Sequence, residues 1–462
     1  MPPAPAVVIA AALSAILAAL SPALAAEKPD FSSDMQARKS YLVPALEIVG
    51  FDLLLNQFNR RVLPGSDFDT SLASVRRNLR SSWVVENDPF RVNQLGHPYQ
   101  GSMYHGFARS AGLSYWESSL YTFAGSAFWE IAGETTQPSW NDQIASGVGG
   151  SFLGEALYRM ASLLLERGDG VRLWREAGAA AISPALGFNR LAFNRFDAIV
   201  ASRNPAYYSR AAIALSGTTQ NQQGATQRIK RGELLGDFSL DYGLPGKPGY
   251  SYDRPFDYFS FQATLSSANG FENVMTRGLL LGTDYELGRN YRGVWGLYGS
   301  YDYIAPQLFR VSSTALSLGT TGQWWLSNGV ALQGTALGGI GYTAAGTIRG
   351  TGEQDYHYGG APQVLAALRF IFGERASLDI IGRQYFVSSV AASLRGGHEN
   401  ITRADVAFTV RIYKQHALAV KYLWNRREAT YPDLGDRTQT RGTLGIYYTL
   451  LGHDRFGAVE WR

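Results

Sequence analysis

The sequence has no cysteine, few charged residues and only one long apolar run. Without cysteine, the chain can form no disulfide, no thiolate metal site and no cysteine nucleophile. The 42 Lys and Arg residues nearly balance the 38 Asp and Glu residues, which leaves a net charge of +4. Nucleic-acid binding requires a concentrated basic surface, so this balance argues against a nucleic-acid partner.

Glycine and aromatic residues are abundant instead. The chain has 51 Gly, 10 Trp, 26 Tyr and 23 Phe, whereas charged residues make up 17 % of it, against roughly 25 % in soluble domains. The mean hydropathy is slightly negative, and a polytopic helical membrane protein would be strongly apolar. This composition is typical of a transmembrane β-barrel, because only alternate residues of each strand face lipid.

The single apolar run lies at the N-terminus, over residues 5–24. Small residues at Ala23 and Ala25 and then the charged Glu27 give the order of a secretory signal with an A-x-A cleavage site. We predict a signal peptide over residues 1–26, with an uncleaved helical anchor as the alternative. Export through an oxidising periplasm suits a chain without cysteine.

The rest of the chain changes its period part-way along. Apolar residues follow helical spacing up to about residue 205, whereas from about residue 228 they alternate with polar residues. We predict a helical module over residues 27–214 and a β domain over residues 228–462. The Gln-, Thr- and Gly-rich residues 215–227 between them are predicted to be a linker.

Strict alternation in the second half sends two sets of side chains to opposite faces of each strand. Val406, Phe408 and Val410, for example, alternate with Asp405 and Thr409. A soluble β-sandwich gives the same pattern and is the alternative. Three features favour a membrane barrel: long strands, regular recurrence along the chain and aromatic residues at strand ends. Charged residues on the polar register would then line the lumen.

The sequence therefore predicts an α+β protein in which a helical module precedes an antiparallel transmembrane β-barrel of about twelve strands. The strands are expected at residues 230–243, 256–268, 277–289, 293–304, 311–326, 328–346, 360–373, 375–389, 401–413, 415–426, 438–451 and 454–461. The last of these, ending at Trp461, resembles the terminal strand by which outer-membrane barrels are recognised for assembly. The expected partners are outer-membrane lipid and the barrel-assembly machinery, and the expected location is the Gram-negative outer membrane.

The helical module begins with an amphipathic helix predicted at residues 40–62. The densest group of distinctive residues follows at residues 93–166 and contains two helices, predicted at residues 113–133 and 138–166. Three pairs of polar residues lie four apart, on one face of their helix: His105 with Arg109, Glu130 with Glu134, and Glu155 with Arg159. Gly150 and Gly154 also lie four apart, so a neighbouring helix can approach closely there.

Several short motifs occur in order within this group: GHPYQG, ARSAGL, FWEIAGE, PSWND and GGSFLGEALYR. In these motifs the sequence, over roughly residues 85–170, resembles a bacterial envelope domain family of unknown function. The resemblance implies a place in the cell envelope and supplies no activity.

The same group contains the residues that could carry chemistry. A His acting as a general base or as a metal ligand beside carboxylates would suit a hydrolytic or metal site. The candidates are His97, His105, Arg109, Glu130, Glu134, Asp142 and Glu155. Their spacing matches neither H-E-x-x-H nor a nucleophile elbow, and no phosphate-binding loop occurs. Pairing of these polar residues with one another inside packed helices is the alternative, and no cofactor is predicted.

Two functions follow from this organisation. The first is a structural or conduit role in the envelope, with the helical module plugging, gating or underlying the barrel from the lumen or the periplasm. The second is an envelope hydrolase that acts on lipid, lipopolysaccharide or glycan through the His and carboxylate residues. The two differ in one structural requirement, because a hydrolase needs those residues to share one water-accessible cavity.

Overall fold

The computed structural model describes residues 39–166, 172–193, 204–222, 232–346, 352–389, 397–432, 435–453 and 455–461. The chain divides into two compact units, Met1–Ser202 and Arg203–Arg462. The described part of the first unit is helical and that of the second is built of strands, which confirms the predicted order. The predicted signal peptide, residues 1–26, lies outside the described residues.

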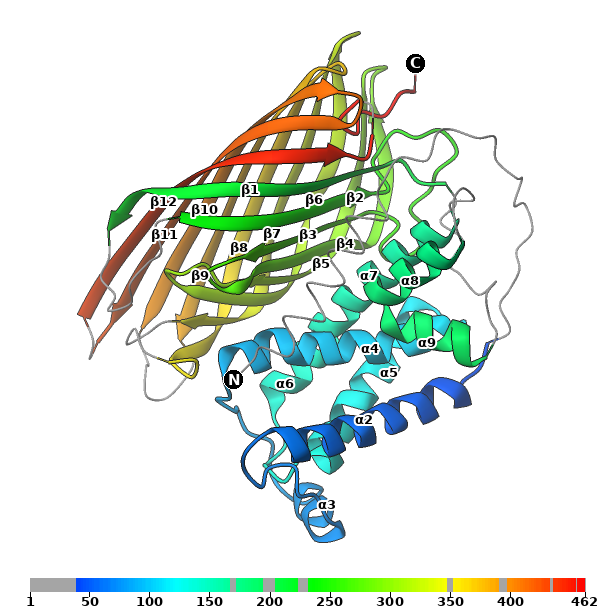
Figure 1. Ribbon diagram of the computed structural model, residues 1–462, viewed down its shortest axis with the longest axis vertical. Helices are drawn as coiled ribbons and strands as arrows, with labels where there is room; N and C mark the ends of the chain where they lie inside the picture. The colour runs from blue at the N-terminus through cyan, green and yellow to red at the C-terminus, as the bar shows by residue number, and fades with distance from the viewer. Residues whose placement is uncertain are drawn as a thin grey trace. The chain divides into compact units, whose positions relative to one another are not determined.

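The second unit is a closed antiparallel β-barrel (Figure 1). Its strands are β1 (Tyr207–Gln222), β2 (Gly232–Tyr242), β3 (Phe259–Ser266), β4 (Gly270–Leu287), β5 (Tyr291–Ile304), β6 (Arg310–Ser327), β7 (Val330–Gly346), β8 (Tyr356–Phe372), β9 (Ala376–Ser389), β10 (His398–Tyr413), β11 (His416–Tyr431) and β12 (Gly435–Leu451). Each strand pairs with its neighbours in the chain, and β1 closes the ring by pairing with β12. The predicted barrel of about twelve antiparallel strands is confirmed.

Eleven of the twelve predicted strands correspond to β2 through β12, and the prediction is wrong at both ends of the β domain. β1 begins within the predicted helical module and extends into the predicted linker at residues 215–227. The polar residues Thr218 and Asn221 pair with β12, because backbone hydrogen bonds form whatever the side-chain polarity. Residues 215–222 are therefore strand, and the first β residue lies well before residue 228.

The strand predicted at residues 454–461 is also wrong. The described residues 455–461 contain no strand, and β12 is the last one. Phe456 and Gly457 adopt φ values of 49° and 83°, which an extended strand does not allow. The segment that ends at Trp461 is therefore not a strand of the folded barrel.

Alternation along the strands separates the two surfaces of the barrel as predicted. On β10, Val406, Phe408 and Val410 are exposed, whereas Asp405 and Thr409 between them are buried. The same separation recurs on other strands, and most of the large exposed side chains of the barrel are aliphatic or aromatic. The outer surface of the barrel is therefore largely apolar, and the charged register faces inward.

The first unit consists of helices with three π-helical turns inserted among them. They are α2 (Leu42–Val62), α3 (Leu72–Asn78), η1 (Val92–Gly96), α4 (His97–Ser110), α5 (Tyr115–Phe128), η2 (Trp129–Gly133), α6 (Trp140–Ile144), η3 (Ala145–Gly149), α7 (Gly150–Glu166), α8 (Arg172–Ile182) and α9 (Pro184–Ala192). The predicted helix at residues 138–166 is thus α6, η3 and α7 in succession. Among the described residues, no helix is both long and apolar enough to cross a bilayer.

Helix α2 confirms the predicted helix at residues 40–62. It buries Ile48 in the core of the unit but leaves most of its leucines exposed. Asp52 and Asn56 are buried against the neighbouring helices, whereas Leu46 and Leu54 are 62 % and 73 % exposed. Burial raises the pKa of Asp52 to about 8, although the Tyr104 hydroxyl donates a hydrogen bond to it. The apolar stripe of α2 therefore faces away from the core of the helical unit.

Glycines allow α4 to pack closely against η3 and α7. These three elements carry most of the polar residues of the candidate site. A Cβ on Gly101 would lie 2.0 Å from the Ser146 carbonyl oxygen, and one on Gly154 would lie 2.8 Å from the His105 Cβ. The close approach predicted from Gly150 and Gly154 is confirmed. No larger residue fits at Gly101 without separating the two helices.

We expect Gly101→Ala to destabilise the helical unit by about 1–3 kcal/mol, because the added methyl overlaps backbone that cannot give way. Gly50→Ala is the matched control: Gly50 lies on α2 with no neighbour within 4 Å of its would-be Cβ, so alanine there should stabilise by about 0.5–1 kcal/mol. Urea unfolding followed by circular dichroism at the helical band measures both changes. Equal effects of the two substitutions would contradict the close packing of α4.

Candidate functional site

The first group of polar side chains surrounds Glu155 on α7, which is fully buried. Its carboxylate accepts hydrogen bonds from Arg109 Nε at 2.7 Å and Arg159 Nε at 2.7 Å, and lies 3.1 Å from His105 Nε2. Burial alone would raise the pKa of Glu155, but the two guanidinium groups hold that pKa well below its usual range. Burial lowers the pKa of His105. Both carboxylate oxygens are thus bound by cations, an arrangement that ties α4 to α7.

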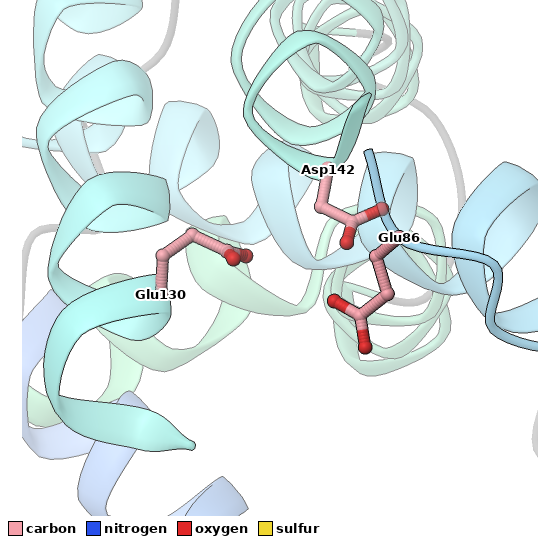
Figure 2. A group of neighbouring side chains, drawn as sticks. All are labelled: Glu86, Glu130 and Asp142. Carbon is pink, nitrogen blue, oxygen red and sulfur yellow. The ribbon is translucent and has the colours of Figure 1, made fainter. Parts of the chain in front are cut away.

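The second group is acidic and lies where α6 and η2 meet the segment before η1. Figure 2 shows the carboxylates of Glu86, Glu130 and Asp142 directed toward one another, and one oxygen of each lies within 4.8 Å of the others. His97, the first residue of α4, places Nε2 3.9 Å from Asp142 Oδ2. Its Nδ1 lies 3.3 Å from the Ser146 hydroxyl. Three carboxylates therefore converge, and the His97 imidazole lies beside one of them, Asp142.

Backbone and amide contacts hold these acidic side chains in place. The Asn141 side chain donates to Asp142 Oδ1 at 2.9 Å and accepts from the Glu86 backbone N–H at 2.8 Å. The Ser139 backbone N–H donates to Glu130 Oε2 at 2.8 Å. An isolated β-bridge between Val84 and Ser139 joins the two segments. The Asp142 and Glu130 carboxylates are thus held by their supporting residues, and Glu86 is held through its backbone.

Burial and repulsion perturb this group strongly. Burial, followed by the charge of Asp142, raises the pKa of Glu86 to about 9. The same two causes raise the pKa of Glu130 well above its ordinary value. Burial also raises the pKa values of Asp88 and Glu134. Several carboxylates packed together repel one another when all are ionised, and this repulsion raises the free energy of the folded state. The group therefore favours a bound proton or a bound cation.

The structure divides the seven predicted site residues between the two groups. His105, Arg109 and Glu155 belong to the first group, and His97, Glu130, Glu134 and Asp142 to the second or its margin. Eight residues separate the two histidines on α4, which corresponds to about 12 Å along the helix axis. The candidates therefore do not share one cavity. Sequence reasoning missed Glu86 and Asp88, whose only signal was a pair of carboxylates just before the motif region.

Polar side chains also meet across the inside of the barrel. Arg210 on β1 donates to Asp379 Oδ2 on β9 at 3.0 Å, although three strands lie between β1 and β9 in the ring. Arg369 on β8 donates to Asp379 at 2.7 Å and contacts Asp241 on β2 at 3.0 Å. The Arg369–Asp379 pair joins the adjacent strands β8 and β9, whereas the Arg210–Asp379 and Arg369–Asp241 pairs join distant walls and so cross the lumen.

A second set of contacts crosses the lumen between β5 and β9. The Tyr385 hydroxyl donates to Asp302 Oδ2 at 2.8 Å, and Arg277 Nη2 donates to Asp302 Oδ1 at 2.8 Å. The cavity beside them measures about 10 Å³, which is room for about one water molecule. Side chains therefore leave little open space beside these contacts.

The C-terminal segment 455–461 occupies one end of the lumen. The Gln323 side chain donates to the Val459 carbonyl at 2.7 Å and accepts from the Val459 N–H at 2.9 Å, while Gln333 donates to the Gly457 carbonyl at 2.8 Å. Apolar side chains of the segment pack with inward-facing residues from around the ring, namely Tyr208, Trp325, Ala331, Ile371, Ala417 and Leu451. We call residues 455–461 the C-terminal plug.

Two further connections fold inward. Residues 243–258, between β2 and β3, place Tyr250, Tyr252 and Tyr258 against the inward-facing side chains Leu279, Val294, Tyr298, Leu337 and Leu365. Residues 305–309, between β5 and β6 at the opposite end, place Leu308 and Phe309 against inward-facing Met275, Ile304, Val387 and Ile401. Apolar clusters thus lie inside the barrel together with the charged pairs that cross it.

Residues 82–185 match a described family. The family is described as "Domain of unknown function (DUF3943)". The match spans both groups of polar side chains in the helical unit, from Glu86 to Glu155, and it assigns them no activity. The predicted resemblance to a domain family of unknown function is confirmed at this level. No curated protein matches the chain.

Solved structures similar to this chain are outer-membrane barrels. The chain is 7 % identical to the NanC porin, with a TM-score of 0.26, over 52 % of this chain and 98 % of that one. The outer membrane channel DcaP of Acinetobacter baumannii is 8 % identical, with a TM-score of 0.24, over 53 % and 96 %. The Pseudomonas putida toluene transporter TodX is 9 % identical, with a TM-score of 0.23, over 54 % and 90 %. The barrel assignment rests on the strand pairing described above.

Proposed function

We propose that this protein is a gated conduit of the Gram-negative outer membrane whose resting state is closed by parts of its own barrel. The observation that carries the proposal is the occupied lumen, with the C-terminal plug hydrogen-bonded to Gln323 and Gln333 at one end. Polar groups buried by a plug must all be satisfied, and the plug satisfies them by side-chain contacts that can be exchanged for water. Release of the plug would open that end.

The strand connections support an orientation for the barrel. At the end that holds the C-terminal plug, β4–β5, β6–β7, β8–β9 and β10–β11 are joined by two or three residues each. Outer-membrane barrels have short turns on the periplasmic side and longer loops outside. β1 begins at this same end, where its residue Arg210 pairs with Leu451. We therefore place the plug and the entry of the helical unit on the periplasmic side.

The helical unit fits a position beneath the membrane better than one inside the lumen. The lumen already holds segments of the barrel unit, and its lining is charged. The exposed stripe of α2, with Leu46, Leu53 and Leu54, is apolar instead. Apolar helix faces of this kind bind at a lipid interface. The helical unit would then underlie the barrel with α2 against the periplasmic leaflet.

The hydrolase hypothesis has less geometric support. It requires the histidines and carboxylates to share one cavity, whereas His105 and Glu155 are sealed by ion pairs and separate from the acidic group. The acidic group keeps one histidine, His97, whose Nδ1 lies 3.3 Å from the Ser146 hydroxyl. Ser146 is only 1 % exposed, so this hydroxyl is not open to an incoming substrate.

Planar-bilayer recording tests the conduit proposal. We expect the wild-type protein to be almost silent and a chain truncated after Leu451 to give sustained conductance, because the C-terminal plug is gone. Gln323→Ala combined with Gln333→Ala leaves the C-terminus intact and should give frequent openings through loss of the plug's hydrogen bonds. Heat-modifiable migration on gels confirms that each variant has folded. A wild-type channel that stays open, or folded variants that remain silent, would overturn the proposal.

A further inference from the structure

The acidic group of the helical unit has the composition of a metal site. Glu130 and Asp142 are 3 % and 2 % exposed, Glu86 is partly buried, and the three come from separate elements. Buried charges in proteins are paired or coordinate a metal. Each π-helical turn of the unit lies next to a residue of this group, since η1 precedes His97, η2 contains Glu130 and η3 contains Ser146. Such turns recur at functional sites.

His97 supplies an observation independent of the acidic cluster. The side chain is 7 % exposed, and its Nε2 is directed at Asp142 Oδ2 across 3.9 Å, too far for a hydrogen bond. The other ring nitrogen, Nδ1, lies within reach of the Ser146 hydroxyl. A metal-binding histidine has this pattern, because one nitrogen faces the ion while the other is held by a neighbouring polar group.

The distances fit a small divalent ion after a slight adjustment. Bonds from such an ion to nitrogen or oxygen measure about 2.0–2.2 Å, so two ligands on opposite sides of it lie about 4.2 Å apart. The His97–Asp142 separation of 3.9 Å lies within that span. The three carboxylate oxygens lie within 4.8 Å of one another, whereas His97 Nε2 is near Asp142 only. Binding one ion therefore requires the carboxylates to move slightly inward and the His97 ring to turn toward them.

We propose that Glu86, Glu130, Asp142 and His97 bind one divalent transition-metal ion, Mn²⁺ or Zn²⁺. Carboxylate oxygens with one imidazole suit these ions, whereas Ca²⁺ takes oxygen ligands alone. The ion would neutralise carboxylates that otherwise repel each other, and Asn141 and Ser139 would orient them from behind. This proposal stands apart from the conduit, since it concerns the helical unit alone.

Titration of the full-length folded protein with Mn²⁺, followed by the electron paramagnetic resonance signal of free Mn²⁺, tests the proposal. We expect one Mn²⁺ per chain to lose its free signal and to be displaced by Zn²⁺. Glu130→Gln and His97→Gln should each weaken binding at least about tenfold. Asp69→Asn is the matched control, because Asp69 lies on the surface in an exposed ion pair with Arg60.

Glu130→Gln also separates loss of the site from loss of the fold. It is nearly isosteric and removes one of the repelling charges, so the metal-free variant should unfold at a urea concentration equal to or above that of the wild type. Zn²⁺ should then raise the unfolding midpoint of the wild type and leave that of Glu130→Gln unchanged. No Mn²⁺ binding by the wild type, or equal binding by the wild type, Glu130→Gln and His97→Gln, would overturn the proposal.

Discussion

Replacing Glu155 with alanine is expected to destabilise the helical unit strongly while the barrel stays as stable as in the wild type. Glu155 is fully buried and is the shared partner of Arg109, Arg159 and His105. The substitution leaves two buried guanidinium groups facing each other without a counter-charge. Removing one partner of a buried ion pair costs about 3–5 kcal/mol, a large part of the 5–15 kcal/mol that stabilises a typical domain.

Helical circular dichroism during urea unfolding measures this loss, and heat-modifiable migration reports the barrel separately. Glu117→Ala is the matched control: Glu117 caps α5 at the surface and pairs with the exposed Lys39, so its removal should cost about 0.5–1 kcal/mol. A Glu155→Ala protein as stable as Glu117→Ala would show that the ion cluster does not hold α4 to α7.

The difference in unfolding free energy between the wild type and Glu155→Ala should depend on pH in a defined direction. The pKa of Glu155 is lowered in the folded unit, so its contribution is complete above the ordinary glutamate pKa of 4.5. It is lost only as the pH falls through the lowered value, because protonation then removes the charge that pairs with the two arginines. The stability difference between wild type and Glu155→Ala should therefore shrink well below pH 4.5 and stay constant from there to neutral pH.

The barrel could be predicted from the sequence because the outer surface of each strand is apolar and the inner surface is polar. Val406 and Phe408, for example, face outward and Asp405 faces inward, so apolar and polar residues alternate along the strand. The prediction is wrong at the two ends of the β domain, where this alternation no longer reports the structure. β1 extends into polar residues beyond Gly217, and residues 455–461 keep a short alternation although they fold into the lumen.

The helical unit was predictable only within single helices. The spacing of His105 and Arg109 places both on one face, and the Glu155–Arg159 pair forms as predicted. Which partner lies opposite depends on the packing of α4 against α7, which brings together residues 50 positions apart. The acidic group likewise needs the bridge from Val84 to Ser139. The spacing of residues within one helix predicts neither the contact between α4 and α7 nor the bridge between Val84 and Ser139.

Helix α2 shows a further limit of periodicity. The sequence shows which of its residues share a face, and Leu46, Leu53 and Leu54 do share an exposed one. It does not show that Asp52 and Asn56 on the other face are the buried ones. The apolar face of a soluble helix is usually buried, so the exposure of these leucines emerges only from the packed structure.

Replacing Asp379 with alanine is expected to loosen the barrel and open its lumen. Asp379 binds Arg369 on β8 at 2.7 Å and Arg210 on β1 at 3.0 Å, and so links distant walls. Without it, the two guanidinium groups share only Asp241, which contacts Arg369 at 3.0 Å. The cost should be about 3 kcal/mol, since one partner of a largely buried charge cluster is removed.

Two measurements follow from this change in charge. The heat-modifiable transition should move to lower temperature, and the openings seen in planar bilayers should become frequent and anion-selective, because the lumen gains net positive charge. Glu428→Ala on β11 is the matched control, since its pair with Arg426 is exposed and its loss should leave both readouts unchanged. Silent Asp379→Ala channels with an unshifted transition would show that this cluster does not close the lumen.

The double variant Asp379→Ala, Arg210→Ala makes the test specific to the pair. Removing Arg210 as well takes away the uncompensated guanidinium, while Arg369 keeps its contact with Asp241. The double variant should therefore recover part of the thermal stability and lose the anion selectivity of the single variant. Residues in direct contact deviate from additivity by about 0.5–3 kcal/mol, whereas distant residues add. Strict additivity of Asp379→Ala and Arg210→Ala would mean that the two residues act separately on opposite walls of the barrel.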